Sequence, residues 1–374
     1  MSSENPTTLL ELHKALCLIP SVYPHELPVS TYLAEWLRSR GWTVEQQVVS
    51  TTPLRHNMYA YLGRRRETRA VLNSHLDVVP PYVEIREDEE NVYGRGTCDA
   101  KGSVASQIWA AEELRAEGRA RIDRLRTQFL LLDPLFGHII HLCFNRLLYV
   151  VGEEFDHIGM IQANKLEISP EFVIVGEPTE NILAKGHKGV MVFTLEATGK
   201  AAHSGYPELG KSAVEILVDV LHELKNLVLP VDPYLGANTL NLGLISGGVA
   251  VNIIPERATA KCSVRVTTDI SALWELFRSV VHRYAPHVRM VEGMTFDPVR
   301  CEVVDGYEIK AMGFFTGEWG FCLDIPFFHG EHKNFLLGPG TIHVAHGENE
   351  FVRKQDLVDA VGLYKKLLGK LLDV

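Results

Sequence analysis

The 374-residue sequence lacks several features, and each absence disfavours a class of protein. Its six cysteines include no CxxC pair, which argues against a disulfide framework and against a cysteine-bound zinc site. Basic residues are too few for a nucleic-acid or anionic-membrane surface, because the net charge is −10 and no basic tract stands out. No internal repeat or low-complexity tract is visible. These absences leave an ordinary globular protein without a nucleic-acid or membrane surface.

Long apolar runs are also missing. The most apolar stretch, residues 127–151, is interrupted by Asp133, Pro134 and Arg146, so it does not suit a membrane span. The N-terminus shows no basic segment followed by a long apolar one, and we therefore expect no secretory signal. Scattered cysteines suit a reducing compartment. These observations predict a cytoplasmic protein without nucleic-acid or membrane partners.

The composition, with 46% hydrophobic and 22% charged residues, is typical of a soluble globular protein. At this length a single core usually gives way to two domains. Apolar periodicity predicts helices over residues 9–19, 29–40 and 102–118, and a last helix over 354–372. β-rich runs predict strands over residues 43–49, 57–63, 70–79, 147–151 and 171–175. The pattern indicates an α/β domain with a strand at 70–79 that is buried on both faces.

A different pattern begins near residue 184. A strand at 190–197 is followed by a helix at 212–227, strands at 239–248 and 257–266, a helix at 271–285 and a strand at 288–293. This βαββαβ order is that of the ferredoxin-like fold. We therefore predict a module at 184–295 that is inserted into a catalytic domain formed by 1–183 and 296–374.

Imidazole and carboxylate side chains follow several of the predicted strands. They are His75, Asp99, Glu153, Glu154, Glu177 and His346. Open α/β sheets bind ligands beyond the carboxyl ends of their strands, and this set of donors suits zinc, cobalt or manganese. Each residue alone is as well explained by a polar strand end or a solvated turn. Their combination favours a two-metal site, which could activate a water and polarise an amide carbonyl.

The motifs SHLDVVPP, GRGTCDAKG, VVGEEFD, VGEPTE and HVAHGENEF resemble those of a family of co-catalytic zinc amidohydrolases. It includes acetylornithine deacetylase, succinyl-diaminopimelate desuccinylase, aminoacylases and glutamate carboxypeptidases, and the chain is most similar to the first. The resemblance covers nearly the whole chain. It implies an α/β/α catalytic domain with a mixed central sheet, interrupted by a ferredoxin-like dimerisation domain. It also implies a homodimer and two divalent metal ions, zinc first and cobalt as the alternative.

The resemblance further implies two sets of metal ligands that share one bridging carboxylate. The first set is His75, Asp99 and Glu177, and the second is Asp99, Glu154 and His346. Glu153 would then be the general base. Asp77, two residues along the predicted strand, would face the same side as His75 and orient its imidazole.

Other residues carried over from the resemblance would act on the substrate. His203 would polarise the scissile carbonyl from the partner subunit. Asn252 and Arg265 would bind the substrate carboxylate, which an Arg guanidinium can grip with two hydrogen bonds. Gly338 and Gly340 would let backbone groups approach the substrate. The bland alternatives are a loop histidine for His203 and a solvent-facing or ion-paired arginine for Arg265.

The remaining histidines have no spacing that singles them out, and we treat them as structural or surface residues. His343 precedes His346 by three residues. Because we expect a strand there, the two side chains should lie on opposite faces, and only His346 should bind metal.

Two segments depart from the family pattern. Some two dozen residues rich in Leu, Phe and Ile separate the helix ending near Gly118 from the strand at 147–151. We expect either an extra packed element or a stretch foreign to the fold, because such connections are normally a few residues long. The second segment is 313–323, where Leu323 replaces an expected threonine and Asp324 keeps the position of an aspartate.

Hydrolysis of the amide bond of N-acyl amino acids, as in deacetylation of an N-acetylornithine-like substrate, is the leading hypothesis. A dipeptidase or carboxypeptidase with the same metals is the alternative, since the shape of the loops decides the leaving group. A catalytically impaired dimeric scaffold is the alternative from another class.

Overall fold

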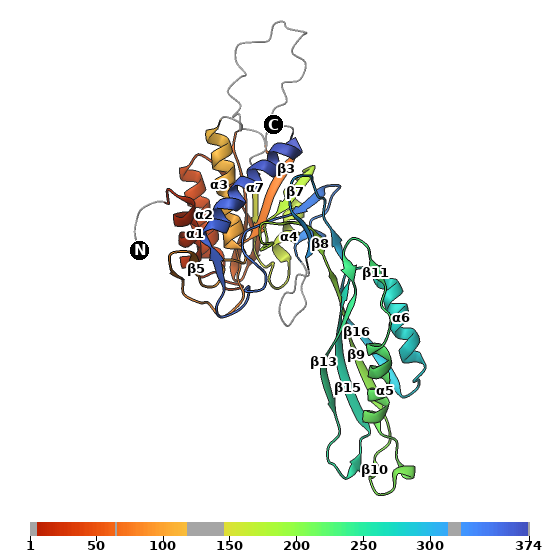
Figure 1. The fold of residues 1–374 in the computed structure, drawn as a ribbon. Coiled ribbons are helices and arrows are strands. Elements are labelled where there is room, and N and C mark those ends of the chain that lie inside the picture. Colours follow the sequence, from red (N-terminus) through yellow and green to blue (C-terminus); the bar gives the residue numbers. More distant parts are fainter. Residues whose placement is uncertain (1–5, 64–65, 118–145, 313–322, 373–374) are drawn as a thin grey trace. The chain divides into compact units, whose positions relative to one another are not determined.

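The computed structural model describes residues 6–63, 66–117, 146–312 and 323–372, and contacts within the chain divide it into two units (Figure 1). Unit 1 comprises Met1–Lys185, Cys301–Lys310 and Leu323–Val374. Unit 2 comprises Gly186–Arg300 with Ala311–Cys322. The predicted boundaries, 183/184 and 295/296, lie close to these. The two segments that depart from the family pattern, 124–146 and 313–323, fall outside the described residues except for Arg146 and Leu323.

A mixed β-sheet forms the centre of unit 1. Its strands run in the order β1 (Thr43–Thr51), β2 (Leu54–Tyr61), β6 (Arg146–Val150), β3 (Ala70–His75), β7 (Phe172–Val175), β19 (Lys333–Leu336), β8 (Leu183–His187) and β17 (Val299–Arg300), and β18 (Ile309–Met312) also pairs with β8. β3 is parallel to β6 and β7, and β7 is parallel to β19, whereas β1, β2 and β8 pair antiparallel. Every residue of β3, β6 and β7 is buried. The predicted mixed sheet with a doubly covered central strand is confirmed.

Helices cover both faces of this sheet. They are α1 (Leu9–Leu18), α2 (Leu27–Ser39), α3 (Lys101–Ala116), α4 (Ile158–Ala163) and α7 (Lys354–Leu372). The Tyr149 hydroxyl donates to Val104 O of α3, while Asn57 Nδ2 donates to Gly159 O of α4. Tyr149 is paired with Met58, so the adjacent Asn57 points to the opposite face. α3 and α4 therefore lie on opposite faces, as an α/β/α domain requires.

Local chemistry explains where the helices begin and end. Thr8 and Glu11 form a capping box at the start of α1, and Gly41, with a φ of 85°, follows α2. A small sheet in the order β20 (Phe351–Arg353), β5 (Asn91–Tyr93) and β4 (Arg86–Glu87) leads directly into α7. Among the described helices, none is long and apolar enough to cross a membrane.

Unit 2 contains the predicted βαββαβ module. Its elements are β9 (Gly189–Thr198), α5 (Ala213–Lys225), β13 (Thr239–Gly247), β15 (Arg257–Val266), α6 (Ile270–His282) and β16 (Val288–Phe296). The strands are antiparallel in the order β13-β15-β9-β16, which is the ferredoxin-like order. Alternate residues of β9 and β15 are buried, and they form one apolar core with α5 and α6. Further short pairs are β10 (Ala202–His203) with β14 (Ile253–Ile254), and β11 (Val231–Asp232) with β12 (Gly236–Ala237).

Two local predictions were wrong. The chain around His343 and His346 forms a turn and not a strand, because Gly340 and His346 adopt left-handed φ values of 79° and 64°. His343 is nevertheless turned to solvent, with 77% of its side chain exposed against 20% for His346. Likewise β3 ends at His75, so Asp77 lies beyond the strand that we expected it to share.

Candidate active site

The carboxyl ends of three parallel strands meet at one edge of the unit 1 sheet. His75 is the last residue of β3, Glu153 and Glu154 follow β6, and Glu177 follows β7. Asp99 lies just before α3, and His346 lies on the turn before β20. The structure thus brings together all six residues that the sequence singled out as a metal centre.

The two carboxylate oxygens of Asp99 face different histidines. Asp99 Oδ1 lies 3.1 Å from His75 Nε2, and Oδ2 lies 3.2 Å from His346 Nε2. His75 Nε2 is also 3.6 Å from Glu177 Oε1, and His346 Nε2 is 3.1 Å from Glu154 Oε2. In each resulting triad the three donor atoms lie within 4.8 Å of one another. Asp99 therefore stands between two groups of donors.

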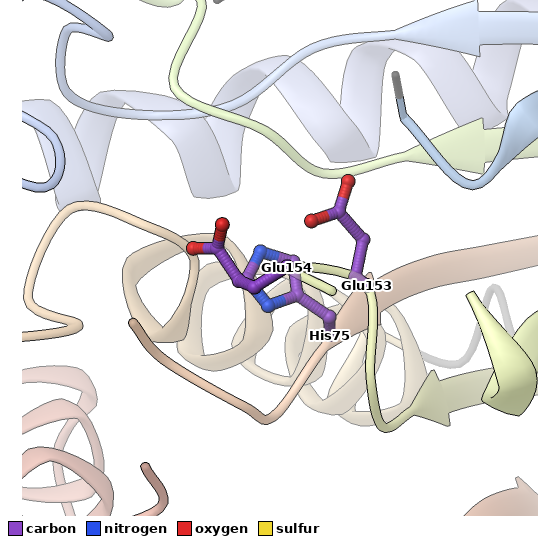
Figure 2. Close-up of side chains that lie close together, drawn as sticks. All are labelled: His75, Glu153 and Glu154. Atoms are coloured by element: carbon purple, nitrogen blue, oxygen red, sulfur yellow. The ribbon is translucent and has the colours of Figure 1, made fainter. Parts of the chain in front are cut away.

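A third triad consists of His75, Glu153 and Glu154. In the view of Figure 2, the two glutamate carboxylates lie on either side of the His75 imidazole. Consecutive glutamates are separated in this way because the chain turns sharply after β6, where Gly152 has a φ of 85°. The turn allows each carboxylate a separate task.

The site buries more negative charge than its histidines can balance. Burial and the neighbouring acidic charges raise the pKa of Glu153 and of Glu177 well above the usual range, and raise that of Glu154 to about 7. Burial opposes protonation of His346, yet its hydrogen bonds to Asp99 and Glu154 raise its pKa to about 11. Additional positive charge would relieve this repulsion.

The free donor atoms fit metal ions. Among the described residues, Glu153 Oε1 is buried without a hydrogen-bond partner, and Glu154 Oε2 is buried with only His346 Nε2 near it, at 3.1 Å, because the hydrogen bond of that imidazole goes to Glu154 Oε1. An unpaired buried carboxylate oxygen is costly unless a cation neutralises it. Oxygen and imidazole donors, with one carboxylate between two triads, suit a pair of divalent transition-metal ions.

Asp77 supports the turn that carries the two glutamates. Its carboxylate accepts hydrogen bonds from the backbone N–H of Gly152 (2.8 Å), Glu153 (3.2 Å) and Glu154 (3.0 Å). His75 Nδ1 lies 3.0 Å from the Asp77 backbone carbonyl oxygen, its hydrogen-bond partner, and 3.7 Å from Asp77 Oδ1. Besides its expected position beside His75, Asp77 thus holds the Glu153–Glu154 turn, a contact that sequence spacing does not reveal.

A second buried pair lies beside this centre. His157 Nδ1 is 2.9 Å from Asp324 Oδ1, and the His157 ring stacks on Phe327 with centroids 4.2 Å apart. The charge of Asp324 contributes to the raised pKa values of Glu153 and Glu177. We had treated His157 as a structural or surface residue because no motif marks it. Its burial beside Asp324 makes it part of the surroundings of the site.

Gly338 and Gly340 are buried and pack against the ligand loops. A Cβ at Gly338 would collide with Ser103 Oγ and the Glu177 carbonyl oxygen, and one at Gly340 would collide with Cys98 Sγ. Glycine is required at both positions by atoms of the chain itself.

The remaining predicted residues belong to unit 2. His203 is exposed on β10. The backbone N–H of Ser204, the residue after His203, donates a hydrogen bond to the Asn252 carbonyl oxygen (3.0 Å). Arg265 is half-buried near the opposite end of β15, eight residues after Arg257. At about 3.3 Å per strand residue, roughly 26 Å of strand separates Arg257 from Arg265. Within one copy of unit 2, Asn252 therefore lies beside His203, whereas Arg265 lies near the other end of β15.

Sequence comparisons identify relatives over most of the chain. Residues 71–126 match the family described as Peptidase family M20/M25/M40, and residues 185–289 match the Peptidase dimerisation domain. A peptidase M20 domain-containing protein of Schizosaccharomyces pombe is 39% identical over 363 residues, which span 96% of this chain and 84% of the relative. A probable carboxypeptidase of Aspergillus flavus is 35% identical and covers 96% of this chain and 90% of its own length.

Solved structures share the fold. A tripeptidase from Staphylococcus aureus has a TM-score of 0.74 at 17% identity, and the match covers 98% of both chains. A Bacillus subtilis protein described as a dinuclear metal binding peptidase from the M20 family has a TM-score of 0.66 at 14% identity, over 98% of both chains.

Proposed function

The chain belongs to the M20 family of metallopeptidases, and from that premise we propose that it is a two-metal hydrolase which releases a C-terminal amino acid from short peptides. The position of Asp99, with one oxygen toward each of two histidines, is the observation that carries the proposal. The probable carboxypeptidases among its relatives support a substrate with a free carboxylate. An N-acyl amino acid is the smallest substrate of this kind, so deacylation of an N-acetylornithine-like compound is the second candidate.

The proposed ligand sets follow the two triads around Asp99. One metal ion would be held by His75, Asp99 and Glu177, and the other by Asp99, Glu154 and His346. When bound, the two cations supply the positive charge that acidifies a water and polarises the scissile carbonyl. Zinc, with cobalt as an alternative, suits these ligands.

Glu153 is the proposed general base. Its Oε1 is buried without a partner among the described residues, and burial raises its pKa well above the usual range. A carboxylate in such surroundings can take a proton from water and pass it to the departing nitrogen. Asp77 keeps this carboxylate in place through the backbone of the Glu153–Glu154 turn.

Unit 2 supports a homodimer. Strand β13 lies at the edge of its sheet, and it exposes Leu244 (67%) and Ile245 (62%) to solvent. An edge strand with exposed apolar side chains is suited to pair with a second copy. In that assembly His203 would act on the scissile carbonyl in the partner's site, beside Asn252, while Arg265 would grip the substrate carboxylate.

The cytoplasm is the proposed location. Cys17, Cys98, Cys262 and Cys301 are all buried and free, which suits a reducing compartment.

A substrate panel with verified metal-free protein tests this function. Dipeptides, tripeptides and N-acetyl amino acids are offered before and after addition of zinc or cobalt, and the released amino acid is measured. We expect no hydrolysis without metal, recovery with either metal, and resistance of matched peptides with an amidated C-terminus. Full activity of the metal-free protein would refute the mechanism, and equal cleavage of the amidated peptides would refute the substrate class. Preference for N-acetyl amino acids would favour the deacylase.

Mixing two inactive variants tests His203 and the dimer together. In a hybrid of His203→Ala and Glu153→Gln subunits, one site retains both residues. Random assembly of equal amounts should therefore restore roughly a quarter of wild-type activity. No recovery in a demonstrably mixed dimer would show that each subunit works alone.

A further inference from the structure

Glu350 is a buried acid outside both ligand sets. Its Oε1 accepts hydrogen bonds from the backbone N–H of Gly96 (2.9 Å), Cys98 (3.1 Å) and Asp99 (3.2 Å), and only 1% of the residue is exposed. A single carboxylate oxygen therefore gathers the loop that presents Asp99.

Arg95 connects the same carboxylate to the turn that carries His346. Arg95 Nη1 donates to Glu350 Oε2 (2.6 Å) and to Gly347 O (3.3 Å), and Nη2 donates to His346 O (3.0 Å). Arg95 is 2% exposed. The planar guanidinium thus reaches, in one rigid fork, the acid and the backbone carbonyl of a proposed metal ligand.

These contacts join two loops that are some 250 residues apart in the chain. The loop of Asp99 and the turn of His346 approach each other beside the N-terminal end of α3. Neither of them is part of a strand of the central sheet. By contrast, His75 and Glu177 adjoin β3 and β7, which pair with each other directly. The position of His346 relative to Asp99 therefore depends far more on side-chain contacts than the position of His75 relative to Glu177 does.

We propose that Arg95 and Glu350 are positioning residues which hold Asp99 and His346 at the separation needed for metal binding. The inference rests on the proposed two-metal function. The pair acts on two of the three donors of the triad Asp99, Glu154 and His346, but on only one donor of the triad His75, Asp99 and Glu177. Loss of the pair should therefore weaken one of the two metal positions more than the other.

Two conservative variants disturb the pair in different ways. In Glu350→Gln the shape is retained, but the amide NH₂ must face either the backbone N–H groups or the Arg95 guanidinium, so donors meet donors. Arg95→Lys keeps the charge and can retain the ion pair, but it loses the fork that also reaches His346 O. Glu171→Gln is the matched control, because Glu171 is an exposed acid of unit 1 that pairs with Arg69 at 2.7 Å.

The test measures metal binding rather than turnover alone. Full-length, verified metal-free proteins are titrated with Zn²⁺ in competition with a chromophoric chelator, and Co²⁺ absorption spectra report the coordination of each position. Partners of metal ligands typically contribute 10- to 100-fold to affinity, so we expect one of two binding steps to weaken by about that factor in both variants. Excess metal should restore most of kcat with KM unchanged, and the control should match the wild type.

Several outcomes would overturn the proposal. Two wild-type binding steps in folded Glu350→Gln and Arg95→Lys would do so, and so would equal weakening of both steps. If Glu350→Gln does not fold in the metal-free state, as judged by circular dichroism, Arg95→Lys alone decides by the same criteria. A wild-type protein that binds fewer than two metal ions would refute the proposed function itself, and this result is visible before any variant is compared.

Discussion

The interiors of the two units differ in the charge that they bury. The described part of unit 1 encloses many ionisable side chains, among them His75, Asp77, Arg95, Asp99, Lys101, Glu153, Glu154, Glu177 and Glu350. Among the described residues of unit 2, the core formed by β9, β15, α5 and α6 is apolar, and the buried acidic and basic residues are only His187 and Asp232. Burying charge costs free energy unless it is paired or put to use. The concentration of buried charge therefore agrees with the proposal that unit 1 carries the chemistry.

The surfaces differ in the opposite sense. The inner strands of the unit 1 sheet, β3, β6 and β7, are buried on both faces, whereas β13 of unit 2 leaves five consecutive residues exposed at the end of its burial pattern. Unit 1 thus encloses a cluster of buried charges, whereas unit 2 exposes an edge strand. Substitutions that change the buried charge of unit 1, the apolar core of unit 2 or an exposed charge can test this difference one property at a time.

Glu153→Gln should give the largest effect. The amide keeps the shape of the side chain and cannot accept a proton, so kcat should fall by about 10² to 10⁴ while the protein stays folded. Steady-state kinetics together with the metal content of the purified variant check this. Glu89→Gln, at an exposed acid of the same unit, is the control. Near-normal turnover would reduce Glu153 to a structural residue.

Phe277→Ala tests the apolar interior of unit 2. Phe277 is fully buried, with its ring centroid 5.3 Å from that of Phe193, and removal of the ring should cost about 3–5 kcal/mol in the free energy of unfolding of that unit. Urea unfolding followed by tryptophan fluorescence measures the loss. Val228→Ala, at a residue of the same unit that is 92% exposed and lies away from β13, should change it by less than about 0.5 kcal/mol. Equal effects of both variants would contradict the assignment of the core.

Asp77→Asn tests whether a buried charge of unit 1 acts through position. The substitution removes one of the oxygens that accept N–H groups of the Glu153–Glu154 turn, so kcat should fall by about 10- to 100-fold even at saturating metal. Kinetics over a range of zinc concentrations measure this. Asp88→Asn is a matched control, because exposed Asp88 Oδ1 accepts the N–H of Glu90 (2.9 Å) and Asn91 (2.7 Å) away from the site. A full rescue by added metal would instead place the defect in metal affinity.

The smallest effect is expected where unit 1 carries charge on its surface. Arg69 and Glu171 pair at 2.7 Å with 44% and 47% of their side chains exposed. Arg69→Ala should lower the free energy of unfolding by less than about 1 kcal/mol and leave kcat unchanged, since water screens such pairs. Thermal denaturation with and without added salt gives the measurement. A larger loss would mean that exposure is a poor guide to the cost of removing a charge in this unit.

Much of the fold could be predicted from the sequence because it depends on local patterns. The buried run at 70–75 and the alternation in 190–197 and 257–266 specify strands directly, and both architectures are confirmed. The cluster around Asp99 was also predicted, because each residue follows a recognisable strand or motif. Its catalytic and ligand roles stay predictions.

Contacts between distant segments could not be predicted. The amide groups that Asp77 holds lie some 75 residues further along, and those that Glu350 holds lie some 250 residues earlier. No local pattern distinguishes Glu350 from Glu348 in HGENE, although only Glu350 is buried. The turn at His346 was missed for a related reason. Its left-handed backbone is maintained by packing and not by a glycine at that position.

The place of β19 in the sheet has a consequence for biosynthesis. β19 comes from near the C-terminus, yet it lies between β7 and β8, which precede it by some 150 residues. A ribosome therefore releases the whole of Gly186–Arg300 before the nascent chain can supply the missing strand. Unit 2, whose strands β9, β13, β15 and β16 are contiguous in sequence, can fold while unit 1 is still incomplete. Until β19 and His346 emerge, the chain lacks the strand that joins β7 to β8, and the proposed ligand sets lack their second histidine.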